Sequence, residues 1–463
     1  MIRPLLLLAC LCACPTLSAQ PTPTAAPATA TDARQALDAW LAAFNKGDRA
    51  TWEAYRQRYG SAMNIDNLLE FRDSIGGFVL VKREPAEGDA AVALLRELES
   101  DHHARLRVTL APGPTARIDL AGVPTPPDLK PARLDAQAAL DDVAAFADAA
   151  SAKDAFAGAL LIAQGDQVLL QGAWGLADRT TGARNTLDTR FRLGSMNKML
   201  TSVAILQLVQ AGNVSLDGTL GDYLPAYPNA DMRRVTVRQL LSHRAGAGDI
   251  FGPEFDRERE HLRTHADYLA LYGTRAPAHP PGSRHDYANY GFVLLGAIIE
   301  AVSGQDYYAY VEEHILLPAG MRDTGSLPES DDMPRRARAY MRTRGQWLDA
   351  AHTLPWRGTA AGGGYSTVGD LLRFARALQG GRLVDPSLLA VATRPDDAGY
   401  GLGFTAGELE GLPWYGHGGG TAGMNTEFRV FPTLDRVVIS LANVDPPVAQ
   451  RLVDRYQARM PLE

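Results

Sequence analysis

The segment from Phe191 to Gly212 constrains this chain more than any other stretch of its sequence. Apolar residues dominate it from Leu200 to Val209, and a glycine follows at position 212. An apolar run of this length is typical of a buried helix, and glycine commonly ends a helix. We therefore expect a helix that starts near Ser195 and lies mostly inside the protein.

Ser195 and Lys198 stand three positions apart at the start of this predicted helix. Residues three apart share a helix face, so the hydroxyl and the amine can touch. A buried amine at the positive end of a helix dipole tends to lose its proton, and a neutral amine can accept the proton of a serine. Taken alone, the motif also fits a chance Ser-x-x-Lys with a solvated lysine.

The use of basic residues makes Lys198 more notable. Only five of the 46 lysines and arginines are lysines, at positions 46, 82, 130, 153 and 198. Arginine cannot act as a base because its pKa is too high, whereas lysine can. Lys198 is therefore a candidate general base.

Length and composition limit the class of protein. A chain of 463 residues is long enough for two domains, and 46% apolar with 21% charged residues is an ordinary globular composition. The net charge of -7 gives no reason to expect a nucleic-acid partner. No internal apolar run is long and clean enough to cross a membrane.

The first 19 residues have the features of a signal peptide: Arg3, an apolar core from Leu5 to Cys14, and small residues up to Ala19. We expect export to the periplasm or beyond, with a mature chain that starts at Gln20 and holds no cysteine. In the alternative, residues 11–14 resemble a lipoprotein box, and Cys14 would carry a lipid anchor.

Composition shifts divide the rest of the chain. Residues 20–32 and 124–132 are linkers rich in proline, the first also in threonine and alanine. Between them, residues 33–123 read as a small α+β domain, with helical periodicity first and strand periodicity after it. Its pattern resembles the nuclear-transport-factor-like fold. The expected helices cover 37–44, 52–59 and 65–71, and the expected strands cover 78–81, 91–95, 106–110 and 118–120.

Residues 133–463 form the second predicted domain. Its strand patterns come from both ends of the domain, and a mostly helical insert spans about 220–378. We therefore expect the Ser195 helix at the junction of sheet and helices, where clefts form. The expected strands cover 157–162, 168–170, 400–404, a glycine-rich stretch near 417, 426–430 and 437–441.

Several histidines allow a site but fit a structural role better. Asp101-His102-His103 fits a solvated turn, and His243 fits a loop-holding residue. His261 and His265 are four apart, as in a metal pair, but no third ligand is evident nearby, so a solvated helix face is the better interpretation.

Further motifs follow Ser195 in a fixed order. They are Leu240-Leu241-Ser242-His243-Arg244-Ala245-Gly246, Tyr287-Ala288-Asn289 ahead of an apolar helix, Gly362-Gly363-Gly364-Tyr365-Ser366-Thr367, and His417-Gly418-Gly419-Gly420. In order and spacing, over about 132–463, the chain resembles the serine β-lactamase and penicillin-binding-protein superfamily. It is most similar to the class C-like hydrolases, which include esterases and D-amino-acid peptidases. This resemblance implies an α/β fold, in which helices flank an antiparallel sheet beside an all-helical subdomain.

The resemblance also implies a role for each motif. Ser195 would be the nucleophile that forms an acyl-enzyme, with Lys198 as its base and Tyr287 passing the proton to the leaving group. Asn289 would orient Lys198 and the substrate. The backbone N–H groups of Ser195 and Gly420 would form the oxyanion hole. No metal or organic cofactor is implied.

The third motif departs from the β-lactamase pattern. His417 stands in place of a lysine and Gly418 in place of a hydroxyl residue, in positions that with Gly419 help to bind substrate. Since histidine is largely neutral near pH 7, strong β-lactamase activity is not expected. Histidine-glycine forms are similar to esterase and aminopeptidase-like members, so we expect hydrolysis of a small ester or peptide.

Two alternatives stay open at this point. The chain could be an inactive penicillin-binding-like protein that binds cell-wall peptides, or its main role could be ligand or partner binding by residues 33–123. The natural substrate and the oligomeric state do not follow from the sequence.

Overall fold

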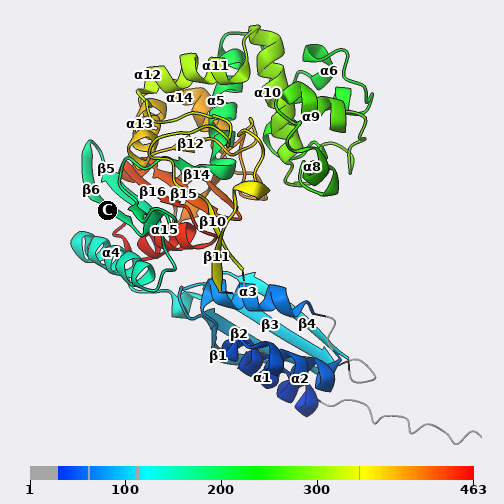
Figure 1. Ribbon diagram of the computed structural model, residues 1–463, viewed down its shortest axis with the longest axis vertical. Helices are drawn as coiled ribbons and strands as arrows, with labels where there is room; N and C mark the ends of the chain where they lie inside the picture. Colours follow the sequence, from blue (N-terminus) through cyan, green and yellow to red (C-terminus); the bar gives the residue numbers. More distant parts are fainter. Residues whose placement is uncertain (1–29, 61–62, 111–114, 344) are drawn as a thin grey trace, which may run out of the picture. The chain divides into compact units, whose positions relative to one another are not determined.

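The computed structural model describes residues 30–60, 63–110, 115–343 and 345–463. Two compact units divide the chain. The smaller holds the described residues up to 65 together with 78–96 and 103–123, and the larger holds 66–77, 97–102 and 124–463 (Figure 1). The predicted domain boundaries remain predictions. The predicted signal peptide and Cys14 lie outside the described residues, and within those residues no helix has both the length and the apolar character needed to span a bilayer.

The smaller unit contains helices followed by an antiparallel meander. Helix α1 (Ala30–Lys46) buries Leu37, Trp40 and Phe44 along one stripe, and Asp48 begins the next helix by accepting a hydrogen bond from the Thr51 N–H. The strands follow in the spatial order β1-β2-β3-β4. The remaining elements are α2 (Arg49–Tyr59), α3 (Ile65–Ile75), most of which groups with the larger unit, β1 (Phe78–Glu84), β2 (Ala90–Glu97), β3 (His103–Leu110) and β4 (Ala116–Val123). The likeness to the nuclear-transport-factor-like fold stays a prediction.

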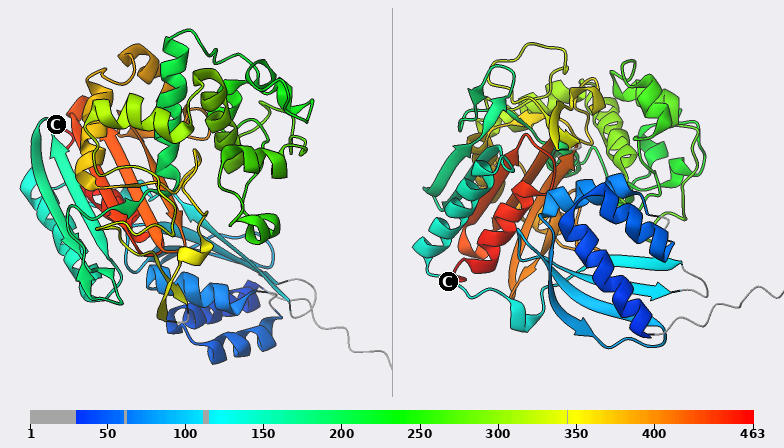
Figure 2. Two further views of the ribbon diagram at one scale, coloured as in Figure 1. Left: turned by 45° about the horizontal axis from the view of Figure 1, so that its top comes forward. Right: turned by 60° about the horizontal axis from the view of Figure 1, so that its bottom comes forward.

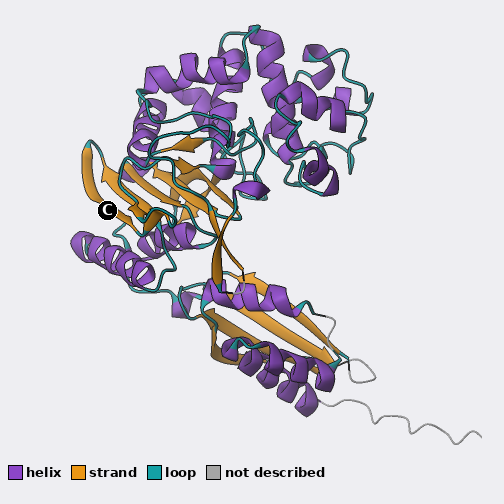
Figure 3. Cartoon of the chain, in the orientation of Figure 1, coloured by secondary structure: helices purple, strands orange, loops and turns teal. Residues whose placement is uncertain are grey.

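The larger unit is built on a six-stranded antiparallel sheet with the order β13-β14-β15-β16-β5-β6 (Figure 3). Two of its strands precede the Ser195 segment in the chain and four come from the last 60 residues, as the sequence predicts. The strands are β5 (Gly158–Gln164), β6 (Gln167–Trp174), β13 (Thr405–Leu409), β14 (Leu412–Thr421), β15 (Met424–Phe431) and β16 (Arg436–Ala442).

Helices cover both faces of this sheet (Figure 2). Helices α4 (Ala136–Ala152) and α15 (Val448–Arg459) pack on the face to which Leu160 and Ile162 point. Leu161 points to the other face, which packs against α5 (Asn197–Gln210) and α13 (Val368–Gln379). The period-two alternation along β5 thus lets both faces of the sheet bury apolar side chains against helices.

In the sequence, the helical part of the larger unit lies between α5 and α13. Together with the sheet, it confirms the expected α/β class. Its longest member, α10 (Asn289–Ser303), is buried over most of its length. The other elements are β7 (Leu176–Asp178), β8 (Ala183–Arg184), β9 (Phe191–Arg192), α6 (Leu220–Tyr223), α7 (Val237–Leu241), α8 (Pro253–Glu258), α9 (His265–Tyr272), α11 (Tyr307–Val311), α12 (Leu317–Ala319), β10 (Tyr340–Thr343), β11 (Gln346–Asp349), β12 (Tyr365–Ser366) and α14 (Pro386–Ala392).

One predicted strand is wrong. Residues 400–404 form a tight turn, in which the Gly401 N–H donates to the Phe404 carbonyl at 2.8 Å, and β13 begins only at Thr405. Gly399 and Gly403 have positive φ angles of 73° and 82°, which extended strand residues do not adopt. In residues 400–404, apolar residues alternate with glycines, and this alternation resembles the pattern of a strand although it belongs to a turn.

Candidate active site

Ser195 lies where strand β9 turns into helix α5. Gly194 makes the turn with φ of 55°, and a short 3-10 segment from Gly194 to Met196 leads into the helix. A Cβ at position 194 would stand 3.2 Å from the Gly419 Cα and 3.3 Å from the Gly420 nitrogen. The serine backbone and strand β14 therefore lie against each other, so a Cβ at position 194 would be crowded as well as strained by the positive φ.

The three predicted catalytic side chains meet at the Ser195 hydroxyl. Its Oγ is 3.1 Å from the Lys198 amine and 2.7 Å from the Tyr287 hydroxyl. Lys198 comes from the first turn of α5, whereas Tyr287 lies 92 residues after Ser195, just before Ala288, the N-cap of α10. Both separations are hydrogen bonds; since the Tyr287 hydroxyl donates to Ser195 Oγ, the serine proton can pass to Lys198 but not to Tyr287.

The surroundings of Lys198 determine which way its lone pair points. Its Nζ is 2.8 Å from Asn289 Oδ1 and 2.6 Å from the Ala361 carbonyl, and both of these oxygens can only accept. A neutral amine has two N–H groups, and these two acceptors use both. In this neutral form the lone pair faces the Ser195 hydroxyl and can accept its proton, whereas a protonated Lys198 donates its third N–H to Ser195 Oγ.

Burial makes the neutral form of Lys198 accessible. The side chain is fully buried, and its removal from water lowers its pKa to about 7, while the negative charge of Asp249 partly opposes this shift. Near neutral pH a substantial fraction of the amine is unprotonated. Lys198 therefore meets the protonation requirement of a general base.

Tyr287 has the opposite protonation preference. Removal from water raises the pKa of its phenol above the ordinary value of 10, so the hydroxyl stays protonated near pH 7. The buried His243, held at φ of 56°, accepts a hydrogen bond from the Ala288 N–H, and its ring lies 4.1 Å from the Tyr287 ring. Tyr287 is thus a positioned proton donor, and His243 has the loop-holding role expected of it.

Asp249 fixes the orientation of Asn289, which sequence reasoning did not foresee. The Asn289 Nδ2 group donates to Asp249 Oδ1 at 2.9 Å. Because a carboxylate only accepts, the amide oxygen of Asn289 must turn towards Lys198. The chain of contacts Asp249–Asn289–Lys198 leads to the nucleophile.

The predicted oxyanion hole lies where strand β14 passes the serine. A Cβ at position 419 would stand 2.3 Å from the Leu193 carbonyl oxygen and 2.9 Å from the Ser195 nitrogen. Gly420, next along the strand, lines the same cavity as Ser195. The two N–H groups assigned to the oxyanion hole thus come from neighbouring backbone segments.

His417 lies behind this cavity and does not line it. Its ring is buried, its Nδ1 donates to the Gly418 carbonyl at 2.5 Å, and its Nε2 accepts from the Tyr400 hydroxyl at 2.9 Å. Burial lowers the pKa of His417 to about 3, so the ring is neutral. Gly418 and Gly419 also lie outside the cavity lining. His417 is therefore buried beside the cavity, and its predicted role in substrate binding stays a prediction.

The catalytic cavity has a volume of about 300 Å³. Its one cationic lining residue among those described is Arg192, which pairs with both oxygens of Glu329 and donates to the Ala337 carbonyl. No unpaired cation of the described lining residues is thus available for a substrate carboxylate.

The other histidine predictions have mixed outcomes. His261 is largely exposed, but His265 is buried, bonded to Glu300 and close to the Ala360 N–H, so the expected solvated face is wrong for His265. Among the described residues, no group of three or more potential ligands is arranged to hold a metal ion.

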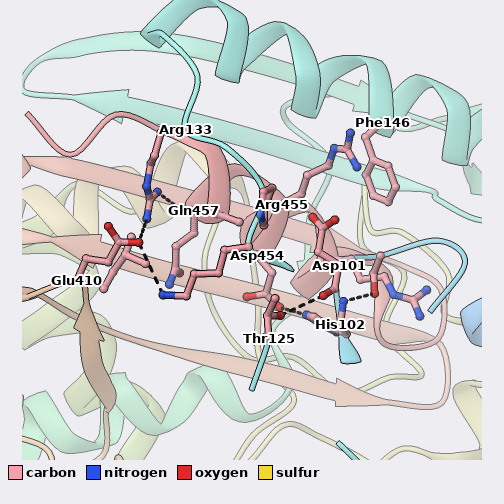
Figure 4. A pocket seen from close by; sticks show the side chains of 15 residues that line it. Asp101, His102, Thr125, Arg133, Phe146, Glu410, Asp454, Arg455 and Gln457 are labelled. Carbon is pink, nitrogen blue, oxygen red and sulfur yellow. Dashed lines mark hydrogen bonds and ion pairs between the residues drawn. The ribbon is translucent and has the colours of Figure 1, made fainter. Parts of the chain in front are cut away.

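A second cavity, of about 230 Å³, is lined only by residues of the larger unit and lies around α15 (Figure 4). Asp101 pairs with Arg459 there, and His102 pairs with Asp454, so the expected solvated turn is wrong. Arg133 pairs with Glu410 in the same way. These charges pair with one another, which fits a structural role.

Comparison with known proteins identifies the family of the chain. The model of the family described as Beta-lactamase matches residues 143–460. The chain belongs to this family. It is 30% identical to esterase EstB of Burkholderia gladioli over 291 residues, covering 55% of this chain and 72% of EstB. It is 28% identical to the D-aminopeptidase of Brucella anthropi, covering 58% of this chain and 52% of that protein.

A solved structure extends the likeness to the fold. The penicillin-binding protein from Bacillus halodurans superposes with a TM-score of 0.61 at 29% identity, over 70% of this chain and 99% of that one. As a member of the Beta-lactamase family with relatives named esterase and D-aminopeptidase, the chain is a serine hydrolase.

Sequence reasoning missed three parts of this site: the Ala361 carbonyl, the Asp249 carboxylate and the Arg192–Glu329 pair. A partial signal existed for the first, since Ala361 precedes the glycine stretch 362–364 that the motif search singled out. Asp249 follows the Leu240–Gly246 motif by three residues, but nothing in its spacing relates it to Asn289.

Proposed function

We propose that this chain hydrolyses small esters or amides through an acyl-enzyme on Ser195. The observation that carries the proposal is the position of the Lys198 amine. Its two N–H groups have acceptors, its pKa is lowered to about 7, and the remaining lone pair faces the serine hydroxyl at 3.1 Å.

The steps follow from these contacts. Ser195 Oγ attacks the carbonyl while its proton moves to Lys198, and the tetrahedral oxyanion forms beside the N–H groups of Ser195 and Gly420. Tyr287 then donates its proton to the leaving alcohol or amine and is reprotonated from Lys198. Water releases the acid by the same transfers in reverse.

The charges of the site favour ester and amide substrates over β-lactams. The ring of His417 is neutral and lies outside the cavity, and Arg192 is neutralised by Glu329. A substrate carboxylate would have to be desolvated without a counter-ion, which is costly. We propose β-lactam hydrolysis as a weak side activity at most.

A substrate screen with matched variants tests the proposal. Wild type should cleave short-chain nitrophenyl esters or D-alanyl anilide faster than nitrocefin. Ser195→Ala should lose about 10³-fold or more of kcat/KM, while Ser215→Ala, an exposed serine, should keep it. Lys198→Ala should fall by orders of magnitude, whereas the surface variant Lys153→Ala should not. Full turnover by Ser195→Ala would exclude the proposed nucleophile.

We also propose that the protein acts after export. The support is the predicted signal peptide of residues 1–19, with lipidation at Cys14 as the alternative outcome. Mass spectrometry of the mature N-terminus separates the two: a chain that starts at Gln20 indicates a free protein, and an acylated Cys14 indicates an anchored one. An unprocessed Met1 terminus would contradict export.

A further inference from the structure

The hydroxyl of Thr426 lies between two backbone carbonyls of the active site. Its Oγ1 is 2.9 Å from the Leu193 carbonyl oxygen and 3.4 Å from the Gly419 carbonyl oxygen. Thr426 is fully buried on β15, directly opposite Gly419 of β14. One hydroxyl proton is thus the donor between two carbonyls, one in the turn that leads to Ser195 and one in the strand beside it.

Asn425, on the same strand, donates to the Gly419 carbonyl as well. Its Nδ2 group is 3.3 Å from that oxygen. Its Oδ1 accepts from the Ala449 and Gln450 N–H groups, at 2.7 Å and 3.3 Å, in the first turn of α15. Helix N-termini leave such N–H groups without partners inside the helix. Because only the amide oxygen can accept from them, the amide nitrogen must face Gly419.

The Gly419 carbonyl determines where the Gly420 N–H points. The two groups belong to one planar trans peptide unit, in which C=O and N–H point in opposite directions. Thr426 and Asn425 hold the carbonyl on the β15 side, so the N–H points away from β15. The pairing of β14 with β13 ends at Gly416, and Gly420 lines the catalytic cavity. The N–H assigned to the oxyanion hole is therefore aimed by side chains outside the cavity lining.

The Ser195 N–H depends on the same hydroxyl. The Gly194 carbonyl, which shares a peptide unit with the Ser195 N–H, accepts from the Gly363 N–H at 3.1 Å. The carbonyl one residue earlier, that of Leu193, is held by Thr426. Two carbonyl oxygens repel each other unless a proton lies between them. Thr426 therefore holds the turn that carries one oxyanion donor against the strand that carries the other.

We propose that Thr426 and Asn425 are positioning residues of the oxyanion hole. By holding two backbone carbonyls, they keep the N–H groups of Ser195 and Gly420 directed at one oxygen of the transition state. This inference rests on the proposed Ser195 acyl-enzyme and adds to it two residues that act through the backbone. Loss of one complete oxyanion donor costs about 10²–10³-fold in kcat. Loss of the support for its position should cost less, about 10-fold to 100-fold.

The test compares 4-nitrophenyl butyrate with its thiono analogue, in which sulfur replaces the carbonyl oxygen. Sulfur accepts weaker hydrogen bonds, so wild type should prefer the oxygen ester in kcat/KM. Thr426→Val keeps the size of the side chain but removes its proton. It should lower kcat/KM for the oxygen ester by about 10-fold to 100-fold and reduce the oxygen-to-sulfur ratio by about threefold or more. A lower fraction of folded protein would reduce both rates equally and leave the ratio unchanged.

Three further variants complete the test. Thr426→Ser retains the hydroxyl and should keep both the rate and the ratio within about threefold of wild type. Thr189→Val removes a hydroxyl from another buried position, outside the cavity lining, and should leave the ratio unchanged. Asn425→Asp keeps the acceptor for α15 but loses the donor to Gly419, and should reduce the ratio in the same direction as Thr426→Val.

An unchanged oxygen-to-sulfur ratio in Thr426→Val would overturn the inference. If that variant does not fold, an unchanged ratio in Asn425→Asp would do so, as would a ratio near one in wild type. If a fluorophosphonate still labels Ser195 of wild type in these cases, the proposed hydrolase function stands. Absence of labelling and of all turnover in wild type would remove both.

Discussion

Replacing Lys198 by methionine should change how the stability of the protein depends on pH. Burial lowers the pKa of Lys198 from 10.5 to about 7 in the folded state, while an unfolded chain restores the ordinary value. Between these two values the unfolded state binds one more proton than the folded state. The free energy of unfolding of the wild type therefore rises with pH, by about 1.4 kcal/mol per unit for this group.

The expected magnitude follows from the size of this shift. At pH 7 the folded protein carries a penalty of ~4 kcal/mol for desolvating the amine, and the penalty disappears only above the unfolded pKa. Methionine has no such proton. It does leave the Asn289 and Ala361 oxygens without a donor, at about 1–3 kcal/mol each, but that cost is independent of pH.

The assay is urea unfolding of wild type and Lys198→Met at pH 7, 8 and 9. The free energy of unfolding is taken from the transition whose midpoint differs between the two proteins. The stability of wild type relative to Lys198→Met should increase by about 2 kcal/mol from pH 7 to pH 9. Other titrating groups cancel in the difference. A difference that stays constant over this range would mean that the folded protein does not release the proton of Lys198 there, and its role as the base would be refuted.

Three further substitutions test other parts of the site. Tyr287→Phe should lower kcat/KM for a nitrophenyl ester by about 10²–10⁴-fold with little change in melting temperature, and a loss below about threefold would contradict the proton-donor role. Gly419→Ala places a methyl group 2.3 Å from the Leu193 carbonyl, so thermal melting should show a loss of about 1–3 kcal/mol in stability, together with lost activity. An unaltered melting curve would show that Gly419 and the Leu193 carbonyl lie further apart. Asp249→Asn removes a charge that raises the pKa of Lys198, so the rise of kcat/KM with pH for an uncharged ester should move to lower pH, and a midpoint that stays or moves up would disagree.

The sequence predicted the parts of the fold and site that depend on local spacing. Ser195 and Lys198 share a helix turn, so their contact follows from helical geometry alone. The buried helix α5 and the hairpin of β5 and β6 have clear periodicity and turn residues. The strand predicted at 400–404 failed because glycines with positive φ were read as part of an alternating pattern.

The remaining parts depend on packing between distant segments. Tyr287 and Asn289 were assigned through the family resemblance, since no spacing rule connects them to Ser195, which lies 92 positions before Tyr287. The Ala361 carbonyl reaches Lys198 across 163 residues, and Asp249 reaches Asn289 across 40. Such contacts are fixed by how helices and loops pack on the sheet. For the same reason the sequence does not show that the His417 ring turns towards Tyr400, and its contact with substrate stays a prediction.

Covalent labelling tests the central claim, that a neutral lysine makes one serine nucleophilic. A fluorophosphonate probe, followed by peptide mass spectrometry, should give one adduct on the peptide that contains Ser195. The labelling rate should rise with pH through a midpoint near 7, the pKa to which burial lowers Lys198. An adduct on another residue, or labelling that persists in Ser195→Ala, would contradict the account.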